Sequence, residues 1–295
     1  MTFSGADPIG RPAIRAERYG AQVDPSVSAI LESMKAEAAI LFLHGVTRRA
    51  ETFAPITGTL GEHYHLHRHD FRGHGESPRR GPYRAIDYLQ DALDFLDVVP
   101  QQRVYVYGHS LGAMVAAALA AQRPKRVTCV VLEDPPFHTM GERIHDSPLG
   151  SYFAAVRGLA GSTKPVGELA RELAEVRYGP GGSLRCGDTR DATTLRFAAS
   201  CLRRLDPAVL DPVAEGRWLD GYPMDDVFRG LLCPALVLQA DAARGGMLTD
   251  ADAAALVERA SDATLVKMPG VGHALHWGAT QATLGHVLAF FASLE

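Results

Sequence analysis

Apolar and polar positions alternate along the chain in two patterns, one typical of buried strands and the other of amphipathic helices. Six short runs predict strands, at 39–43, 63–70, 103–107, 127–132, 235–239 and 264–268. Longer segments between these runs predict helices, because their apolar residues recur at helical spacing, as in 83–99. Strands that alternate with helices pack as a mostly parallel, twisted sheet with helices on its faces. The pattern therefore predicts an α/β fold.

The strand pattern is interrupted once, between two strands of the expected sheet. The interval 137–229 contains short helical patterns, several prolines and the pair Gly181-Gly182. We therefore expect a core domain formed by residues 1–136 and 230–295, with a mostly helical cap, residues 137–229, inserted into it. The first 37 residues are ambiguous and could contain edge strands and a helix.

Composition narrows the classes of function. The 295 residues are 46% hydrophobic and 22% charged, values typical of globular proteins. A net charge of −4 gives no reason to expect a nucleic-acid partner or an acidic membrane surface. No apolar stretch has the length of a membrane span and no signal-peptide pattern opens the chain, so we expect a cytoplasmic protein without a membrane partner. Its oligomeric state is left open. The scattered cysteines predict neither a disulfide framework nor a zinc site: Cys129, Cys186, Cys201 and Cys233.

One pentapeptide carries a candidate nucleophile. Gly108-His109-Ser110-Leu111-Gly112 follows a predicted strand and opens an alanine-rich helix, which is the setting of a G-x-S-x-G nucleophile elbow. Such a bend strains the backbone of the serine and leaves no room for neighbouring side chains, so it requires both glycines. It also places the Leu111 N–H at a helix N-terminus, where it can stabilise a developing oxyanion.

With this motif the chain resembles the α/β-hydrolase superfamily, in the branch that carries a cap domain. Three further segments share the resemblance: His44-Gly45 after the first strand, the turn Asp70–Ser77 (DFRGHGES), and Gly270-Val271-Gly272-His273 near the C-terminus. The resemblance covers the chain from about residue 38 to the end. Within the cap, only the position of the insertion between two strands matches. In the Asp70–Ser77 turn, and for His44, we expect structural roles.

The resemblance implies the remaining parts of an active site. The loop after His44-Gly45 would supply a second oxyanion donor, the backbone N–H of Val46, beside that of Leu111. A serine hydroxyl needs a base to accept its proton, and the base comes last in chain order in this fold. That order favours His273; His276 and His286 are the alternatives.

The acid that would orient His273 has three candidates. The commoner position in the superfamily follows the strand after the cap, where this chain has Asp241, but with Ala243 at the usual place of the acid. Some branches place the acid at the end of the strand before the cap, where Glu133 and Asp134 stand. We favour Asp134, with Asp241 and then Glu133 as alternatives.

Other side chains could contribute to binding. Alternating histidines along the second predicted strand would share one face and could in principle bind a metal, although a packed sheet makes this improbable: His63, His65, His67 and His69. Under the cap, an apolar or aromatic pocket could be lined by His109, Phe137, Met140, Trp218 and Tyr222. Arg203 and Arg204 could meet an anionic group but are more typical of a solvated helix surface. We expect no cofactor and no metal.

The function that these residues favour is hydrolysis of a carboxylic ester or lactone, on a small, apolar or aromatic substrate. An alternative keeps the Ser110–His273 pair but cleaves a carbon–carbon bond or acts as a cofactor-free haloperoxidase-like enzyme. A more remote alternative is a ligand receptor that has kept the fold. The serine argues against the dehalogenases and epoxide hydrolases of this fold, which use aspartate at the elbow.

Overall fold

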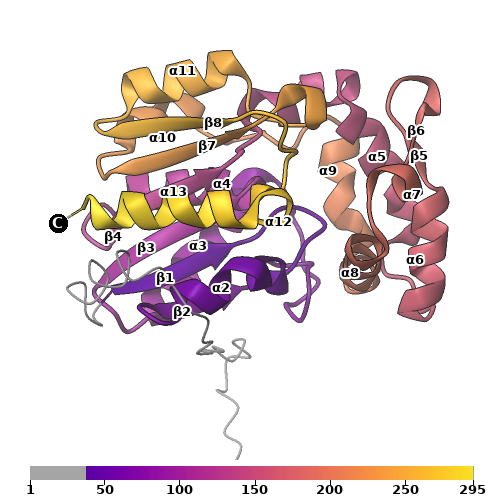
Figure 1. Ribbon diagram of the computed structural model, residues 1–295, viewed down its shortest axis with the longest axis horizontal. Helices are drawn as coiled ribbons and strands as arrows, with labels where there is room; N and C mark the ends of the chain where they lie inside the picture. The colour runs from indigo at the N-terminus through magenta and orange to yellow at the C-terminus, as the bar shows by residue number, and fades with distance from the viewer. Residues whose placement is uncertain (1–37, 295) are drawn as a thin grey trace, which may run out of the picture.

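A parallel sheet of six strands forms the centre of the computed structural model, which describes residues 38–294 (Figure 1). The strands are β1 (Ala38–Leu43), β2 (His65–His69), β3 (Arg103–His109), β4 (Val127–Glu133), β7 (Ala235–Ala240) and β8 (Ala263–Met268). Their order across the sheet is β2-β1-β3-β4-β7-β8, and every pairing is parallel. Each of the six predicted runs is a strand, which confirms the predicted α/β sheet. The expectation for the first 37 residues lies outside the described residues.

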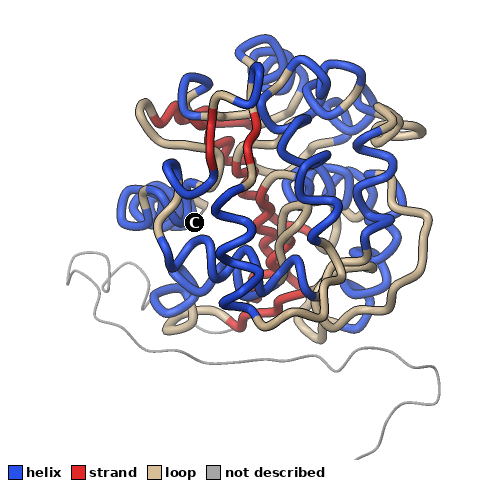
Figure 2. Tube along the Cα trace, turned by 90° about the vertical axis from the view of Figure 1, so that its right-hand side faces the viewer, coloured by secondary structure: helices blue, strands red, loops and turns tan. Residues whose placement is uncertain are grey.

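Helices cover both faces of the sheet, as Figure 2 shows from the side. One face packs against α3 (Ala85–Val98), α4 (Leu111–Gln122), α10 (Met224–Gly230) and α11 (Asp250–Arg259). The other packs against α2 (Ala54–Leu60), α12 (Leu275–Gly278) and α13 (Thr280–Ala292). Side chains alternate between the two cores, so that Leu41 faces α4 while its neighbour Phe42 faces α2. Among residues 38–294 no helix combines the length and the apolar composition that a bilayer-spanning segment requires.

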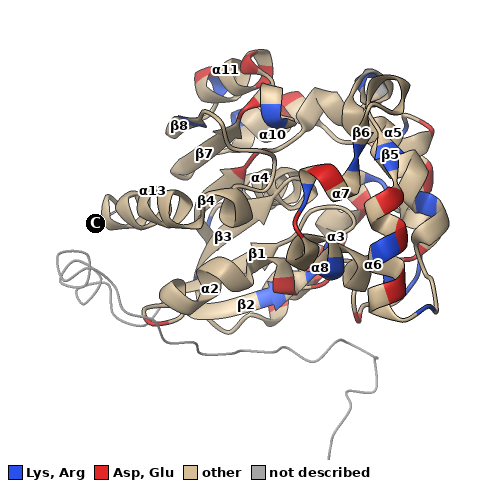
Figure 3. Cartoon of the chain, turned by 45° about the vertical axis from the view of Figure 1, so that its right-hand side comes forward, with Lys and Arg blue, Asp and Glu red and all other residues tan. Residues whose placement is uncertain are grey.

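Between β4 and β7 the chain runs through short helices that gather beyond one end of the sheet (Figure 1). They are η2 (Phe137–Met140), η3 (Glu142–Asp146), α5 (Pro148–Val156), η4 (Arg157–Leu159), α6 (Val166–Glu175), α7 (Cys186–Thr189), α8 (Ala192–Arg203), η6 (Pro207–Leu210) and α9 (Asp211–Ala214). The sequence pattern missed a small antiparallel hairpin here, β5 (Arg177–Tyr178) and β6 (Leu184–Arg185), joined by η5 (Pro180–Gly182). Acidic and basic side chains are interspersed over α6 to α8 (Figure 3).

Several hydrogen bonds attach this inserted segment to the core, two of them at Asp206. The backbone N–H of Asp206 donates to Gly73 O at 2.7 Å, and Tyr83 OH donates to Asp206 Oδ2 at 2.6 Å. Helix α10 belongs to the predicted insertion 137–229, yet it packs on α4 of the core, where Gly230 lies against Ala121.

The strand order also marks where a site is expected. The chain passes from β1 to β2 on one side and then returns to β3 on the other side of β1. At such a switch point the loops that leave the two carboxyl ends diverge and open a crevice, where ligands bind in open α/β sheets. Residues 44–49 leave β1 at this point, before η1 (Ala50–Phe53), and Ser110 leaves β3 beside them.

Candidate active site

Ser110 stands at the sharp bend between β3 and α4. Its backbone has φ 55° and ψ −118°, a strained conformation for a residue with a side chain. A Cβ on Gly108 would lie 2.2 Å from the Gly112 carbonyl oxygen, and one on Gly112 would lie 1.8 Å from Leu43 O. Both glycines are therefore required, and the bend that the pentapeptide predicts is present.

A substitution at Gly112 tests whether the close approach of the β1 backbone, and not helix propensity, makes glycine necessary there. We expect Gly112→Ala to cost about 4 kcal/mol or more of unfolding free energy, because the backbone of β1 cannot move away from the new methyl group. The matched control is Gly285→Ala in α13, where no atom lies within 4 Å of the added Cβ, so the change should stabilise by up to about 1 kcal/mol. Urea denaturation of both variants measures this. Equal stability of the two variants would contradict the tight packing at the elbow.

The loop after β1 lies directly against the elbow. A Cβ on Gly45 would come within 3.1 Å of Ser110 Cβ. The next residues form a turn, closed by the Arg48 N–H to Gly45 O at 3.1 Å, with Thr47 at φ 62°. Among the hydrogen bonds of residues 38–294, neither the N–H of Val46 nor that of Leu111 has an acceptor. The two amides expected from the sequence therefore lie on the loop after β1 and at the first residue of α4, which meet at Ser110.

Backbone strain is concentrated at this edge of the sheet. Within the described residues, the non-glycine positions with positive φ are Thr47, Ser110, Asp134 and Phe137. They lie in the segments that follow β1, β3 and β4, at the carboxyl ends of neighbouring strands. Strained conformations of this kind persist where the surroundings hold them, and they cluster at functional sites.

Asp134 holds the imidazole of His273. His273 Nδ1 lies 2.6 Å from Asp134 Oδ2, and the Asp134 side chain is completely buried. Three backbone N–H groups also donate to this carboxylate, from Ala240 at 3.1 Å, Met247 at 2.8 Å and Leu248 at 3.2 Å. These bonds fix the carboxylate from three sides. The bond to Nδ1 would leave Nε2 of His273 free to accept a proton.

The His273 loop reaches the elbow through His109. His109 Nε2 lies 3.0 Å from the His273 carbonyl oxygen, which accepts its proton, and the two rings are 4.8 Å apart. No hydrogen bond joins Ser110 to His273 among the described residues. Bonds of this type are often long without substrate and tighten in the reacting complex.

The two other candidate acids bind elsewhere. Asp241 accepts hydrogen bonds from the N–H groups of Gly270 at 2.7 Å and Ala243 at 2.8 Å, which lower the pKa of its carboxyl. It therefore braces the loop that leads to His273. Glu133 contacts His276 and does not bond to His273. His286 lies on the exposed side of α13.

The alpha/beta hydrolase fold family matches residues 38–280, a range that contains all six strands together with Ser110, Asp134 and His273. The chain belongs to this family. The match confirms the superfamily that the four sequence motifs indicate.

The named proteins to which this alpha/beta hydrolase is similar include several hydrolytic enzymes. N-formylmaleamate deformylase of Pseudomonas putida is 26% identical over 81% of this chain and 83% of its own. The 2-(acetamidomethylene)succinate hydrolase of Mesorhizobium japonicum is 34% identical, but the alignment covers only 32% of this chain and 34% of that protein. The enol-lactonase of Burkholderia xenovorans LB400 shares the fold, with a TM-score of 0.66 and 19% identity over 94% of this chain and 96% of that one. Other curated relatives are matched over less than half of their own length, such as lipase LipV of Mycobacterium tuberculosis, which is 34% identical over 37% of this chain and 41% of its own.

In this hydrolase the Asp70–Ser77 turn is a structural support for the loop after β1. Asp70 accepts hydrogen bonds from the N–H groups of Ala50 at 2.7 Å and Glu76 at 3.1 Å. Arg72 forms an ion pair with Asp91 at 2.7 Å. The backbone N–H of Phe71 donates to Nε2 of His44, which is fully buried. The geometry agrees with the structural roles expected for this turn and for His44.

Buried neutral histidines in this support predict a dependence of stability on pH. Burial lowers the pKa of His44 and of His74 from 6.5 to about 3. Between these pH values the unfolded chain binds protons that the folded chain does not, so stability is complete above pH 6.5 and falls as the pH drops towards 3. We expect His74→Asn to reduce the slope by up to about 1.4 kcal/mol per pH unit. Urea denaturation of variant and wild type at pH values across this window measures it, and identical slopes would contradict the assignment.

The residues predicted to line a pocket have different surroundings. Phe137 and Trp218 are completely buried, and the ring of Phe137 packs on Phe228 at 4.8 Å. Tyr222 OH donates to Met114 O at 2.7 Å, and Met140 is 1% exposed. These four side chains pack in the interior, and of the pocket candidates His109 lies beside the site. Arg204 contacts Glu76 across the boundary between insertion and core.

The histidines of β2 have separate contacts and form no common site among the described residues, whereas the structure reveals a different cluster. His67 bonds to Gln101 at 2.9 Å, and His69 packs on Phe95. Among the described residues, potential metal-ligating groups converge instead at His109, Glu133 and His276. The sequence signal for this cluster is a pair of adjacent acids at the end of β4, Glu133 and Asp134, together with two histidines three positions apart, His273 and His276.

Proposed function

We propose that this alpha/beta hydrolase cleaves a carboxylic ester or lactone through an acyl-enzyme on Ser110. The observation that carries the proposal is the 2.6 Å hydrogen bond from His273 Nδ1 to the buried Asp134, in a loop that contacts the residue beside Ser110. Neutral serine is a weak nucleophile, and an imidazole held in one tautomer is the arrangement that activates it.

The reaction would proceed in two halves. Nε2 of His273 takes the Ser110 proton as Oγ attacks the carbonyl carbon, and the N–H groups of Val46 and Leu111 stabilise the oxyanion. His273 then donates that proton to the leaving alkoxide, which leaves the acyl group on Ser110. Water, deprotonated by the same histidine, releases the acid and regenerates the hydroxyl. Asp134 keeps the Nδ1 proton in place and stabilises the imidazolium without accepting the proton.

Access to the site favours a small substrate. The His273 side chain is 22% exposed and Ser110 is 4% exposed. We propose that residues 137–229 act as a cap, with the substrate held between it and the carboxyl ends of the strands. The enol-lactonase supports ester and lactone substrates. Cleavage of an amide bond is a second candidate, because the deformylase matches over most of both chains and the same acyl-enzyme would form.

Partitioning of the acyl-enzyme tests the proposal. Two esters of one acid, such as p-nitrophenyl and phenyl butyrate, are hydrolysed in aqueous methanol, and methyl butyrate and butyric acid are quantified. Because both esters give the same acyl-enzyme, the ratio of the two products should be identical. A ratio that changes with the leaving group would show that no common intermediate forms. Matched butyrolactones and butyramides then rank lactone and amide substrates against esters.

A further inference from the structure

Glu133 connects directly to the nucleophile elbow through its backbone. It is the last residue of β4, where it pairs with His109, and its carbonyl oxygen accepts the Ser110 N–H at 2.9 Å. Its side chain is completely buried on the face of the sheet opposite α4. A buried carboxylate is costly unless it is paired and fully hydrogen-bonded, so its partners indicate what it is for.

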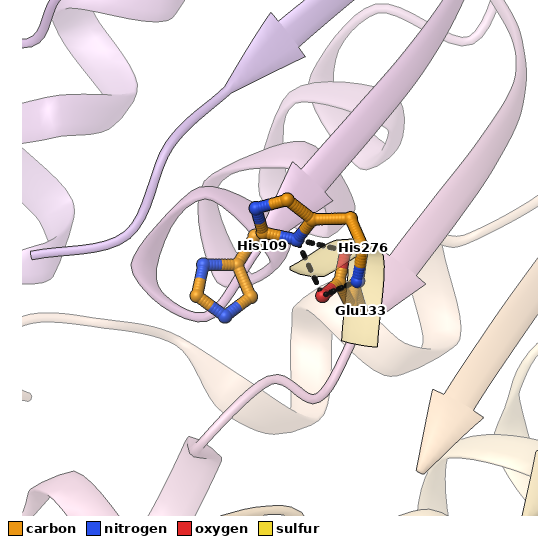
Figure 4. A group of neighbouring side chains, drawn as sticks. All are labelled: His109, Glu133 and His276. Atoms are coloured by element: carbon orange, nitrogen blue, oxygen red, sulfur yellow. Dashed lines mark hydrogen bonds and ion pairs between the residues drawn. The ribbon is translucent and has the colours of Figure 1, made fainter. Parts of the chain in front are cut away.

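Among the described residues, the hydrogen-bond partners of the Glu133 carboxylate are Tyr107 and His276, and Figure 4 shows the contact with His276. Tyr107 OH donates to Oε2 at 2.6 Å. His276 donates twice to Oε1, from Nδ1 at 2.7 Å and from its backbone N–H at 3.1 Å. Burial alone would raise the pKa of Glu133, but the charge of His276 and these hydrogen bonds outweigh it and lower the pKa to about 2.

His276 extends the network to the segment beside the oxyanion loop. Its Nε2 lies 3.2 Å from Thr52 Oγ1, and the next residue, Trp277, donates from Nε1 to Thr52 O at 2.7 Å. The start of α12 is thus tied to β4 and to η1. Adjacent acids at the end of β4 hold histidines three residues apart: Asp134 holds His273, and Glu133 holds His276.

The distances fit a hydrogen-bond network better than a metal site. Zinc bonds to nitrogen and oxygen are about 2.0–2.2 Å, so two ligands of a tetrahedral ion lie roughly 3.3 Å apart. His276 Nδ1 and Glu133 Oε1 are 2.7 Å apart, a distance at which they share a proton. Only one nitrogen of the cluster, His109 Nδ1, is a buried atom without a partner among the described residues.

We propose that Glu133 and His276 form a buried positioning pair that holds the His273 loop against the nucleophile elbow. The inference rests on the proposed function. His109 transmits the restraint, since its ring lies 5.0 Å from that of His276 and 4.8 Å from that of His273, and its Nε2 bonds to the His273 carbonyl. Loosening the pair would let the His273 imidazole shift relative to Ser110, and shifts of about 1 Å at reacting groups can cost about a hundredfold in rate.

The test compares two hydrogen-bonded carboxylates that undergo the same chemical change. Glu133→Gln is expected to lower kcat for p-nitrophenyl butyrate at least about tenfold, with KM unchanged within about twofold. The rate of fluorophosphonate labelling of Ser110 should fall by the same factor. The control is Asp87→Asn, which removes a carboxylate that is 11% exposed and accepts the backbone N–H of Arg84 at the start of α3, on the other face of the sheet. It should lower the melting temperature and leave kcat unchanged.

Each outcome decides one point. A wild-type kcat for Glu133→Gln, measured well below its melting temperature, would overturn the positioning role. A drop in kcat of equal size in Asp87→Asn would do the same, because it would reflect general loosening. If added zinc activates the enzyme and a chelator reverses the activation, the cluster is a metal site and the hydrogen-bonded pair is overturned. If Glu133→Gln does not fold, Tyr107→Phe takes its place in the test. This variant removes one hydrogen bond to Glu133 and is expected to lower kcat without changing KM. If Ser110→Ala keeps full activity, the proposed function itself fails, independently of Glu133.

Discussion

Replacing Ser110 by alanine is expected to lower kcat for ester hydrolysis by about 10⁵-fold or more. The oxyanion donors and the binding surface remain, so a small rate above that of water should persist, but no hydroxyl is available to form the acyl-enzyme. The variant should fold normally, because alanine loses only one oxygen and keeps the backbone of the bend. Initial rates with p-nitrophenyl butyrate measure the effect, and circular dichroism confirms the fold.

The matched control is Ser293→Ala at the end of α13. Ser293 Oγ donates to Phe290 O at 2.7 Å, and the residue lies with Arg103 and Asp262 at the amino ends of the strands, opposite the elbow. This change should leave kcat within a factor of about two. A Ser110→Ala protein that retains wild-type turnover would rule out serine catalysis, whatever the control shows.

Replacing Asp134 by asparagine is expected to lower kcat by about 10⁴-fold, the second largest effect. The amide cannot hold the Nδ1 proton of His273 as the carboxylate does, so the imidazole would turn or change tautomer. The asparagine NH₂ group would also face backbone N–H donors: those of Ala240 and Leu248 if it replaces Oδ1, or that of Met247 if it replaces Oδ2. We expect an additional loss of about 1–3 kcal/mol of unfolding free energy. Steady-state kinetics and urea denaturation measure the two effects separately.

The control for this substitution is the rival acid. Asp241→Asn removes the bond to the Gly270 N–H and loosens the loop before His273, but it leaves the imidazole on Asp134. We expect a decrease in kcat of less than about tenfold. The reverse order of effects, with Asp241→Asn the more damaging change, would assign the acid to the strand after the insertion.

The parts of the molecule that sequence reasoning could predict are those governed by local rules. Buried strands such as β1 can be recognised from their apolar runs. The bend at Ser110 requires glycine at Gly108 and Gly112, and this requirement can be recognised from the pentapeptide alone. The long-range pairing of His273 with Asp134 could be favoured only through the resemblance and the missing acid at Ala243. The distance between His273 Nδ1 and the Asp134 carboxylate could be obtained only from the structure.

Other features depend on contacts that no local pattern encodes. The hairpin of β5 and β6 has two residues in each strand, too few for a period-two signal. Trp218 and Tyr222 could be placed in the insertion, but which side of it they face depends on packing against α4 and its neighbours. Glu133 could be named as a candidate acid, whereas its partner His276 is chosen by the direction of the side chain at the end of β4.

Covalent labelling shows whether Ser110 is a nucleophile that His273 activates. The folded wild-type protein is treated with a fluorophosphonate, digested and analysed by mass spectrometry, with a His273→Ala variant beside it. We expect a single adduct on the peptide that contains Ser110, formed much more slowly in the variant. A folded protein that hydrolyses esters while Ser110 stays unlabelled would contradict this expectation.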